Sequence, residues 1–405
     1  MQSLLRLLLI LLTSIQLFGQ SQFYSPEEVV SYLSSEELKG RRAGTREELK
    51  AARYIKEKFE AIGLTGLEKN LISSFPFSEK LDKHDSIGIT RTGHNVIAQI
   101  DNNQSKTVII AAHYDHLGEG FHPSSRETDP NGKIHFGADD NASGVAGMLS
   151  IANYLNNNNR VEKNNYIFIS FSAEELGLYG SKHWLENSGI DLNNIIAMIN
   201  LDMIGRLDTV SRHLEIYGTG TTSSWNEIIA NSNKDFKIKK IISGIGASDH
   251  NSFYLKGIPA IHIFTGTHED YHKSTDTAEK INFKGVVAVT SFTTRVLEEI
   301  ENKASLPFQK TKTSGDSKRA KMKVTMGIMP SYVAHDKGLL IDGVLSEKPA
   351  EMAGLQEGDI IIEINNNPIN DIYDYMEQLS LFDPGDKTTV KVLRGDITKL
   401  FTIKF

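Results

Sequence analysis

The sequence contains no cysteine among its 405 residues. This absence excludes disulfide bonds, thiolate catalysis, cysteine-ligated metals and a lipid anchor on cysteine. Any bound metal must therefore be held by histidine and carboxylate side chains. The chain also lacks an excess of positive charge, since its formal net charge is −7, and this argues against a general nucleic-acid-binding surface.

Apolar runs of the length of a transmembrane segment are also lacking. The one candidate, residues 7–12, follows Arg6 at the N-terminus and is too short to span a membrane comfortably. It predicts a secretory signal peptide over residues 1–19, with a buried N-terminal helix as the alternative. We therefore expect the protein to be exported, to the periplasm or out of the cell, with no transmembrane segment in the mature chain.

The rest of the chain is long enough for one large domain and a smaller module. Near-continuous apolar runs predict strands at 95–100, 108–112, 166–171, 195–200, 214–217 and 260–264. Helical patterns lie between them at 143–155, 179–186 and 285–301. This alternation predicts an α/β fold with a mostly parallel, doubly wound sheet and helices on both faces. Capping boxes at 25–28 and 45–48 mark two earlier helix starts, and the second helix is expected to end near Gly63.

A change of composition predicts a domain boundary. Residues 305–323 are polar and basic, as linkers are, although a phosphate-binding tail is an alternative. We therefore predict a main domain over 20–304, a linker over 305–323 and a small β-rich domain over 324–405. The small domain should contain short helices at 348–353 and 372–381.

Acidic and imidazole side chains follow the predicted strands at the point where each strand ends. They are His113 and Asp115, the pair Glu174 and Glu175, Asp202, Asp140 in a glycine-flanked loop, and His272 shortly after the last strand. Ligands of open parallel sheets bind at the carboxyl ends of the strands, so these side chains are expected to converge.

Their chemistry favours a two-metal site. Histidine nitrogens and carboxylate oxygens suit zinc, and two neighbouring ions need one shared carboxylate. A further carboxylate must act as general base, and the doublet Glu174-Glu175 could supply both a ligand and the base. Taken singly, each motif can be explained without a metal site, because a lone HxD is common and a lone Glu-Glu usually lies on a solvated surface.

Six motifs in order carry a resemblance to a known family: HYDHLG, GADDNASG, SAEELGLYGS, NLDMIGR, SDHNSF and YHKSTDT. Together they resemble metallopeptidase family 28, the co-catalytic zinc aminopeptidases, which also holds glutamate carboxypeptidases and zinc glutaminyl cyclases. The resemblance covers about residues 38–297, including the opening ELKGRRAGTREELKAARYI. It implies the phosphorylase/hydrolase-like fold of zinc peptidases and two zinc ions per chain.

The resemblance also implies roles for individual residues. His113 and Asp202 would hold one zinc, Glu175 and His272 the other, and Asp140 would bridge them. Asp139 would then be a non-ligand. Glu174 would be the general base acting on the water that bridges the metals, and Tyr271 would stabilise the oxyanion or simply pack. The supporting residues around the ligands would be Asp115, Asn141 and Asp276.

Further residues near the site have weaker assignments. Asp276 is expected to hydrogen-bond locally and fix the His272 loop. The pair Asp249-His250 is interpreted as structural or substrate-facing. Gly137 and Gly144 are expected to serve backbone turns around Asp140. Four loop histidines, namely His116, His122, His135 and His268, lie near the predicted site and could line it, but they are expected to be exposed and without a metal role.

The C-terminal residues resemble protease-associated PDZ domains, through MGIM at 326–329 and through PAEMAGLQEGD at 349–359. PDZ domains add a peptide strand to a sheet edge and hold a C-terminal carboxylate on backbone N–H groups. The resemblance implies that the loop is formed by Met326, Gly327, Ile328 and Met329, and that its partner is a peptide or protein C-terminus. A packing module without a ligand is the alternative.

These features predict an exported aminopeptidase that hydrolyses peptides with a free N-terminus. Glutaminyl cyclase or carboxypeptidase activity are alternatives within the family. An inactive scaffold that binds peptides through the PDZ-like domain is an alternative outside enzymes, but none of the implied ligands or the base is missing.

Overall fold

The computed structural model describes residues 25–67, 70–79, 89–122, 124–311, 323–330, 337–344, 348–370 and 372–405. The chain divides into two compact units between Gln309 and Lys310, inside the segment predicted as a linker. The domain bounds 20–304 and 324–405 stay a prediction, and the predicted signal peptide at 1–19 lies outside the described residues.

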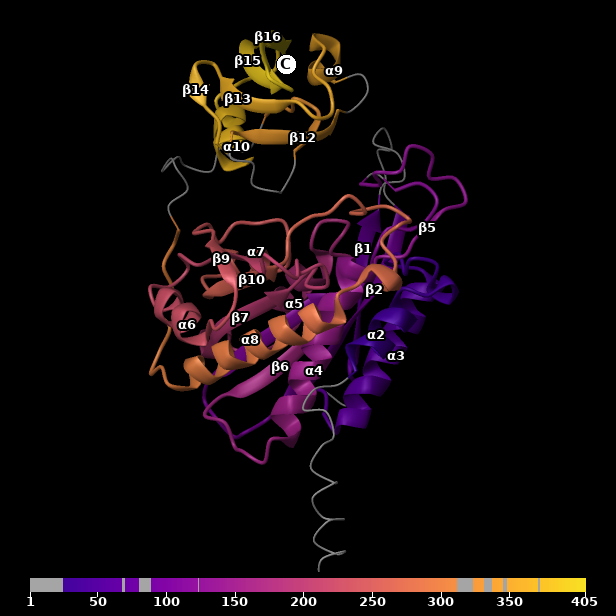
Figure 1. Ribbon diagram of the computed structural model, residues 1–405, viewed down its shortest axis with the longest axis vertical. Coiled ribbons are helices and arrows are strands. Elements are labelled where there is room, and N and C mark those ends of the chain that lie inside the picture. The colour runs from indigo at the N-terminus through magenta and orange to yellow at the C-terminus, as the bar shows by residue number, and fades with distance from the viewer. Residues whose placement is uncertain are drawn as a thin grey trace, which may run out of the picture. The chain divides into compact units, whose positions relative to one another are not determined.

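The first unit is built on an eight-stranded sheet in the order β1-β2-β6-β3-β7-β10-β8-β9 (Figure 1). Its strands are β1 (Ile72–Glu79), β2 (Ile89–Ile100), β3 (Thr107–His113), β6 (Asn165–Phe171), β7 (Ile195–Leu201), β8 (His213–Tyr217), β9 (Lys237–Lys240) and β10 (Ala260–Phe264). The centre, β6-β3-β7-β10, is parallel throughout, and β8 pairs in parallel with β9. The β1–β2, β2–β6 and β8–β10 pairs are antiparallel. The predicted mostly parallel sheet is confirmed.

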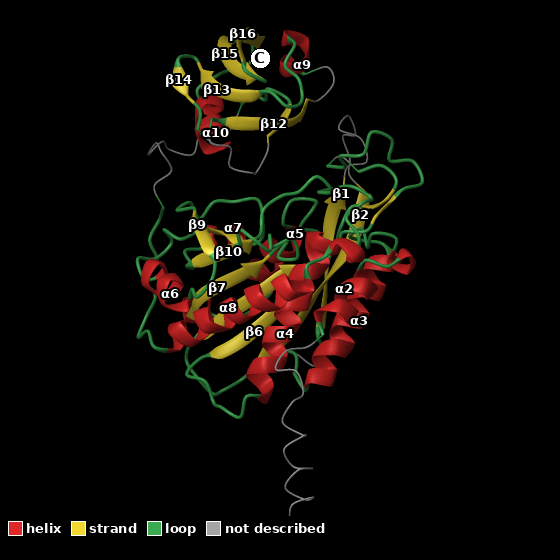
Figure 2. Ribbon diagram, viewed as in Figure 1, coloured by secondary structure: helices red, strands yellow, loops and turns green. Residues whose placement is uncertain are grey.

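Helices cover both faces of this sheet (Figure 2). They are α2 (Pro26–Leu33), α3 (Arg46–Ile62), α4 (Gly144–Asn157), α5 (Tyr179–Asn187), α6 (Trp225–Ser232), α7 (His250–Leu255) and α8 (Phe283–Glu301). On one face, α4 contacts α2, α3 and α8 as well as β3, β6 and β7. On the other, α5 and α7 contact each other, with α5 against β1 and β2 and α7 against β7 and β10.

The side chains of β3 show why the sheet is buried on both faces. Successive residues of a strand point to opposite faces, and here Ile110 joins the hydrophobic cluster that includes α4. Ile109 joins a separate cluster with Trp184 of α5 and Phe253 of α7. All seven residues of β3 are buried, which explains its continuous apolar sequence.

The predicted elements are present with small shifts at their ends, except that β2 begins at Ile89 and not at the predicted Asn95. Helix α3 is capped by Thr45 Oγ1, which accepts from the Glu48 N–H at 3.2 Å, and ends at Gly63 with φ 96°. Helix α2 begins at Pro26 as expected, although the Ser25 side chain makes no capping bond. Strands β1 and β9 were not predicted, and neither was the short hairpin of β4 (Gly118–Glu119) and β5 (Ile134–His135).

The second unit is β-rich, as predicted, and has its own hydrophobic core. Its elements are β11 (Ile328–Pro330), β12 (Leu339–Val344), α9 (Pro349–Ala353), β13 (Ile360–Ile364), β14 (Asn367–Pro368), α10 (Ile372–Ser380), β15 (Lys387–Arg394) and β16 (Ile397–Lys404). The strand order is β11-β12-β13-β15-β16, antiparallel throughout, with β14 paired to β13. Over the described parts of the chain, none of the helices has the length and apolar character needed to cross a membrane.

Candidate metal centre

The fold gathers the predicted side chains at the carboxyl edge of the parallel strands. His113 is the last residue of β3, Glu175 follows β6, and Asp202 follows β7 directly. His272 lies in the loop after β10, and Asp140 lies in the turn that leads into α4. All five are largely or fully shielded from solvent. The topology thus produces the convergence that the sequence predicts.

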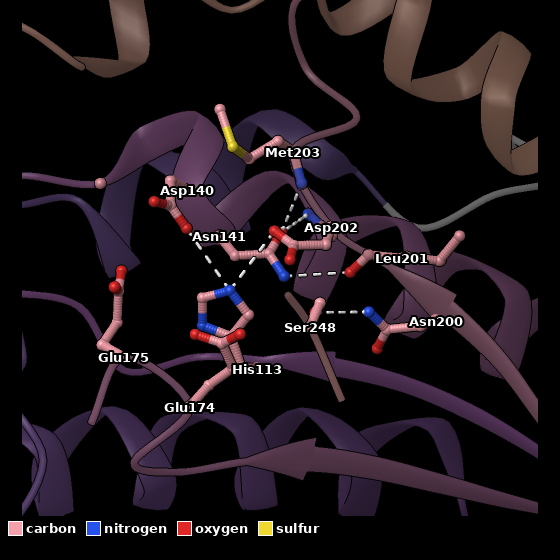
Figure 3. A network of polar contacts seen from close by, with 12 residues as sticks. His113, Asp140, Asn141, Glu174, Glu175, Asn200, Leu201, Asp202, Met203 and Ser248 are labelled. Carbon is pink, nitrogen blue, oxygen red and sulfur yellow. Dashed lines mark hydrogen bonds and ion pairs between the residues drawn. The ribbon is translucent and has the colours of Figure 1, made fainter. Parts of the chain in front are cut away.

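The distances among these five side chains fall into two sets that share one carboxylate. His113 Nε2 lies 3.4 Å from Asp140 Oδ1 and 3.3 Å from Asp202 Oδ1 (Figure 3). His272 Nε2 lies 3.1 Å from Asp140 Oδ2 and 3.3 Å from Glu175 Oε2. Asp140 therefore presents one oxygen to each histidine.

These donor atoms fit metal ions. Two groups have ligand atoms that all lie within 4.8 Å of one another: His113 with Asp140 and Asp202, and His116 with Asp140 and Glu175. Ligands about 2.0–2.2 Å from one zinc in tetrahedral geometry stand roughly 3.3–3.6 Å apart. Three of the four spacings above are 3.3 or 3.4 Å, and the fourth, from His272 to Asp140, is slightly shorter at 3.1 Å. The nitrogen and oxygen donors suit zinc, and a carboxylate common to both groups suits a pair of ions.

The charges at the site lower the pKa values of two of the candidate ligands, Glu175 and Asp140. Burial alone would raise the pKa of Glu175, but the His272 charge and the hydrogen bonds from His116 and His272 outweigh it and hold that pKa below the usual range. The pKa of Asp140 is likewise held well below its ordinary value, because His116, His113 and His272 outweigh its burial. Ionised carboxylates are the form that binds metals.

Glu174 lies beside this centre but belongs to neither donor group. Its backbone N–H donates to Asp115 Oδ1 at 3.1 Å, and its carboxylate lies next to the His113 ring (Figure 3). Burial raises the pKa of Glu174 well above its ordinary value, although the His113 charge opposes the shift. A raised pKa moves a carboxylate toward the range that suits a general base.

Tyr271 packs its ring against His272, with ring centroids 3.8 Å apart and an interplanar angle of 26°. Burial raises the pKa of the Tyr271 phenol well above its ordinary value, and the charges of Asp140 and Glu175 add to the shift. The phenol is therefore held neutral, in the form that can donate a hydrogen bond. The position of Tyr271 fits either role that the sequence suggests: packing of its ring, or a hydrogen bond to an oxyanion.

Asn141 ties the Asp140 turn to the Asp202 segment. Its Nδ2 donates to the Leu201 carbonyl at 3.0 Å, and its Oδ1 accepts from the Met203 N–H at 3.1 Å (Figure 3). The amide can do both because it carries a donor and an acceptor, which an ionised aspartate does not. It thereby fixes the residues on either side of Asp202 relative to Asp140.

Asp115 and Asp276 support the site from other sides. Asp115 faces His113 Nδ1 with its carbonyl at 3.3 Å and its Oδ1 at 3.8 Å. Asp276 does not act locally as predicted: its Oδ2 accepts from the backbone N–H groups of Asp139 and Asp140, at 2.9 and 3.1 Å. It therefore anchors the Asp140 turn, because the loop after β10 folds back against that turn.

The two remaining acidic candidates lie outside both donor groups. Asp139 Oδ1 accepts from the Gly205 N–H at 2.6 Å and from Ser143 Oγ at 2.9 Å, so it braces the backbone beyond Asp202. Asp249 and His250 are buried at the start of α7. Burial raises the pKa of Asp249 to about 7.

The expectation that the four loop histidines are exposed is wrong. The exposed fractions of His116, His122 and His135 are 1%, 3% and 0%, and the His268 side chain is 13% exposed. The β4–β5 hairpin explains the burial of the first three, because it folds against the His272 loop. Within that contact, His272 Nδ1 lies 2.8 Å from the Ser124 carbonyl, which leaves His272 Nε2 for the metal side.

Glycines at the turn act in two different ways. Gly137 has φ 60°, and a Cβ there would lie 2.2 Å from the Asp140 carbonyl oxygen, so the predicted turn function is confirmed. Gly144 has an ordinary helical φ of −63°. A side chain there would instead collide with Asn141, because its Cβ would lie 2.3 Å from Asn141 Oδ1, so Gly144 is needed for close approach.

Sequence reasoning missed Arg41, which is fully buried. Its guanidinium donates to five backbone carbonyls, including Tyr114 at 2.5 Å, Gly137 at 2.7 Å and Asp140 at 3.2 Å. It thus holds together the segments that follow His113 and precede Asp140. The one signal was its place in GRRAGT at the opening of the resemblance, but nothing in that segment indicates burial.

In the second unit, the predicted carboxylate-binding loop forms the entry to the first strand. Met326 is buried, Gly327 has φ 79°, and Ile328 and Met329 lie in β11. Strand β11 stands at one end of the strand order. The loop is therefore next to a sheet edge.

Comparisons with known proteins match both units. Residues 95–296 match the model of peptidase family M28, and residues 324–405 match the model of the PDZ domain. A probable lipoprotein aminopeptidase, LpqL, from Mycobacterium tuberculosis is 32% identical over 200 residues. That match covers 46% of this chain and 36% of the relative, so the chain spans about a third of that relative's length.

Solved structures share the fold at low identity. A zinc aminopeptidase from Bacillus subtilis is 19% identical with a TM-score of 0.56, covering 71% of this chain and 98% of that chain. A glutaminyl cyclase from Porphyromonas gingivalis is 19% identical with a TM-score of 0.54, covering 69% and 100%. The same fold therefore occurs in proteins named for two different reactions.

Proposed function

The chain belongs to peptidase family M28 through its first domain and carries a PDZ domain after it, and we propose that it is an exported two-zinc aminopeptidase. The observation that carries this proposal is the shared carboxylate of Asp140, which faces His113 with one oxygen and His272 with the other. The similarity to a lipoprotein aminopeptidase supports both the reaction and the export.

We assign the ligands as the family resemblance implies. His113 and Asp202 would hold one zinc, Glu175 and His272 the other, and Asp140 both. Bound there, the ions would polarise the scissile carbonyl and lower the pKa of water. Asp115, Asn141 and Asp276 keep the ligand-bearing loops in place through the hydrogen bonds described above.

The chain's own residues would carry the proton steps. Glu174, outside both donor groups, takes the proton from the attacking water and returns it to the leaving amine. Tyr271, neutral and beside His272, would donate a hydrogen bond to the developing oxyanion. Carboxylates around the site would also favour a substrate with a positively charged α-amine.

A substrate panel tests this function. We expect aminoacyl and dipeptide substrates with a free α-amine to be cleaved, and N-acetylated forms to lose about 10⁴-fold in kcat/KM, as sites built to bind an N–H group do. Elemental analysis of the same preparation should find two zinc ions per chain. Cyclisation of N-terminal glutamine, or cleavage of C-terminal residues alone, would keep the metal site but refute the reaction.

We propose separately that the PDZ domain binds peptide C-termini at Met326, Gly327, Ile328 and Met329. The support is the place of this segment, a turn at Gly327 that leads into a strand at the end of the sheet order. Random hexapeptide pools with free carboxylates should bind the full chain at least roughly tenfold more tightly than amidated pools, measured by fluorescence anisotropy. Equal binding of both pools would favour the packing module.

A further inference from the structure

His116 is a buried histidine in contact with the metal centre to which the family resemblance gives no role. Its exposed fraction is 1%, and its Nδ1 lies 2.9 Å from Glu175 Oε1 and 3.7 Å from Asp140 Oδ2. Its ring stands edge-on to that of His272, with centroids 5.8 Å apart. It therefore contacts the three side chains assigned to the second metal while being buried itself.

The two oxygens of Glu175 have different partners. Oε1 is 2.9 Å from His116 Nδ1, the ordinary length of an N–H···O hydrogen bond. Oε2 is 3.3 Å from His272 Nε2, which is long for such a bond and typical of two ligands around one ion. One oxygen thus faces the metal position while the other faces the His116 ring.

The backbone around His116 fixes the ring in this place. A Cβ at Gly137 would lie 2.6 Å from two atoms of the imidazole, so the ring fills the space that this glycine leaves. The His116 N–H donates to the Arg41 carbonyl at 3.4 Å, and Arg42 forms a β-bridge with His116. The ring packs against Gly137 with its Nδ1 beside Glu175 Oε1, so the backbone around His116 determines the hydrogen bond between these two side chains.

We propose that His116 is a positioning residue that donates its Nδ1–H to Glu175 Oε1 and so keeps Glu175 on the second metal through Oε2 alone. Without this bond both oxygens are free to bind the ion, and the second oxygen then occupies a coordination position otherwise open to water or substrate. Hydrogen bonds to metal ligands commonly change affinity by about 10–100-fold. The inference rests on the proposed two-zinc function and adds a determinant of the coordination at one of its two sites.

Three variants of the full chain test it: His116→Ala removes the donor, His116→Asn restores an N–H near the Nδ1 position, and His213→Ala is the matched control. His213 lies on β8, pairs with Glu215 and belongs to neither donor group. Each protein is loaded with zinc or cobalt. The readouts are metal stoichiometry, affinity by chelator competition, and the visible absorption of bound Co²⁺, which weakens when its coordination number rises.

We expect His116→Ala to bind one of the two ions about 10–100-fold more weakly and to show weaker Co²⁺ absorption. His116→Asn should restore most of both properties, and His213→Ala should match the wild type. Wild-type affinity and absorption in a folded His116→Ala protein would overturn the proposal. X-ray absorption that counts a third imidazole nitrogen on the metals would overturn it too, since His116 would then be a ligand. A wild-type protein that holds fewer than two ions would refute the two-zinc function itself.

Discussion

Replacing Glu174 with glutamine is expected to lower kcat for aminoacyl substrates by about 10²–10⁴-fold, the usual contribution of a general acid–base group. The amide has the size of the carboxylate but cannot accept the proton of the attacking water. Because Glu174 lies in neither donor group, Glu174→Gln should retain both zinc ions. The backbone N–H that anchors residue 174 to Asp115 is unaffected by the change.

Two measurements on the same preparation separate proton transfer from metal binding: kcat under saturating substrate, and zinc content by elemental analysis. Glu186→Gln is the matched control, since Glu186 is exposed on α5 and should keep full activity. If Glu174→Gln loses zinc in proportion to activity, Glu174 is a ligand. If kcat falls less than tenfold with zinc retained, another group is the base.

The parallel centre of the fold was predictable because its strands are buried on both faces. Runs such as 108–112 and 166–171 are apolar except for Ser170, which is the pattern expected of a strand between two helical layers. Strands β1 and β9 lack it because they form the two edges of the sheet. Strand β1 alternates buried Phe75 and Phe77 around exposed Pro76, and β9 is the lysine-rich segment KIKK. Proline and lysine are common on edge strands, so neither run reads as a strand in isolation.

The convergence of the candidate ligands was predictable for a related reason, since His113, Glu175, Asp202 and His272 follow predicted strands and Asp140 lies in a glycine-flanked loop ahead of a helix. The contacts that the supporting residues make were not predictable. Spacing alone assigns Asp276 to its own loop, but it binds backbone N–H groups more than 130 positions earlier. His116 resembles a solvated loop histidine in sequence, but the β4–β5 hairpin and Gly137 enclose it. Contacts of this kind depend on how loops fold over the site, which periodicity and spacing do not encode.

Arg41 is the largest of these omissions, and Arg41→Met is expected to destabilise the first domain by about 3–5 kcal/mol, the range for removing one partner of a buried charged network. All five guanidinium contacts go to backbone carbonyls: Tyr114, Leu33, Phe136, Gly137 and Asp140. Methionine fills similar volume but leaves these acceptors unpaired, and each buried unpaired group is costly.

The charge of Arg41 adds to the effect of its hydrogen bonds. Burial lowers its pKa to about 10, while Asp140, Asp115 and other carboxylates of the metal centre oppose the shift, so the guanidinium stays protonated at neutral pH. Arg41 is thus a buried cation that interacts with a cluster of buried carboxylates. Its removal leaves the repulsion between these carboxylates less compensated. The loss of stability should be greatest when no metal is bound.

Urea unfolding with and without zinc measures the effect. Both tryptophans of the chain, Trp184 and Trp225, lie in the first unit, so their fluorescence reports its unfolding separately from the PDZ domain. Arg53→Met is the control, because Arg53 is exposed on α3 and its loss should cost less than about 0.5 kcal/mol. A loss below about 1 kcal/mol in Arg41→Met would show that water replaces the guanidinium at these carbonyls.

Arg41→Lys separates the charge of the guanidinium from its geometry. Lysine keeps the positive charge but has three donors on one nitrogen, so it can satisfy at most three of the five carbonyls, and these come from three different segments. If charge compensation dominates, Arg41→Lys should recover most of the stability of the zinc-free protein. If the planar, five-donor geometry of the guanidinium dominates, Arg41→Lys should be nearly as unstable as Arg41→Met with or without zinc. Zinc affinity should then fall in both variants, because the Tyr114 and Asp140 segments lose the side chain that anchors them to each other.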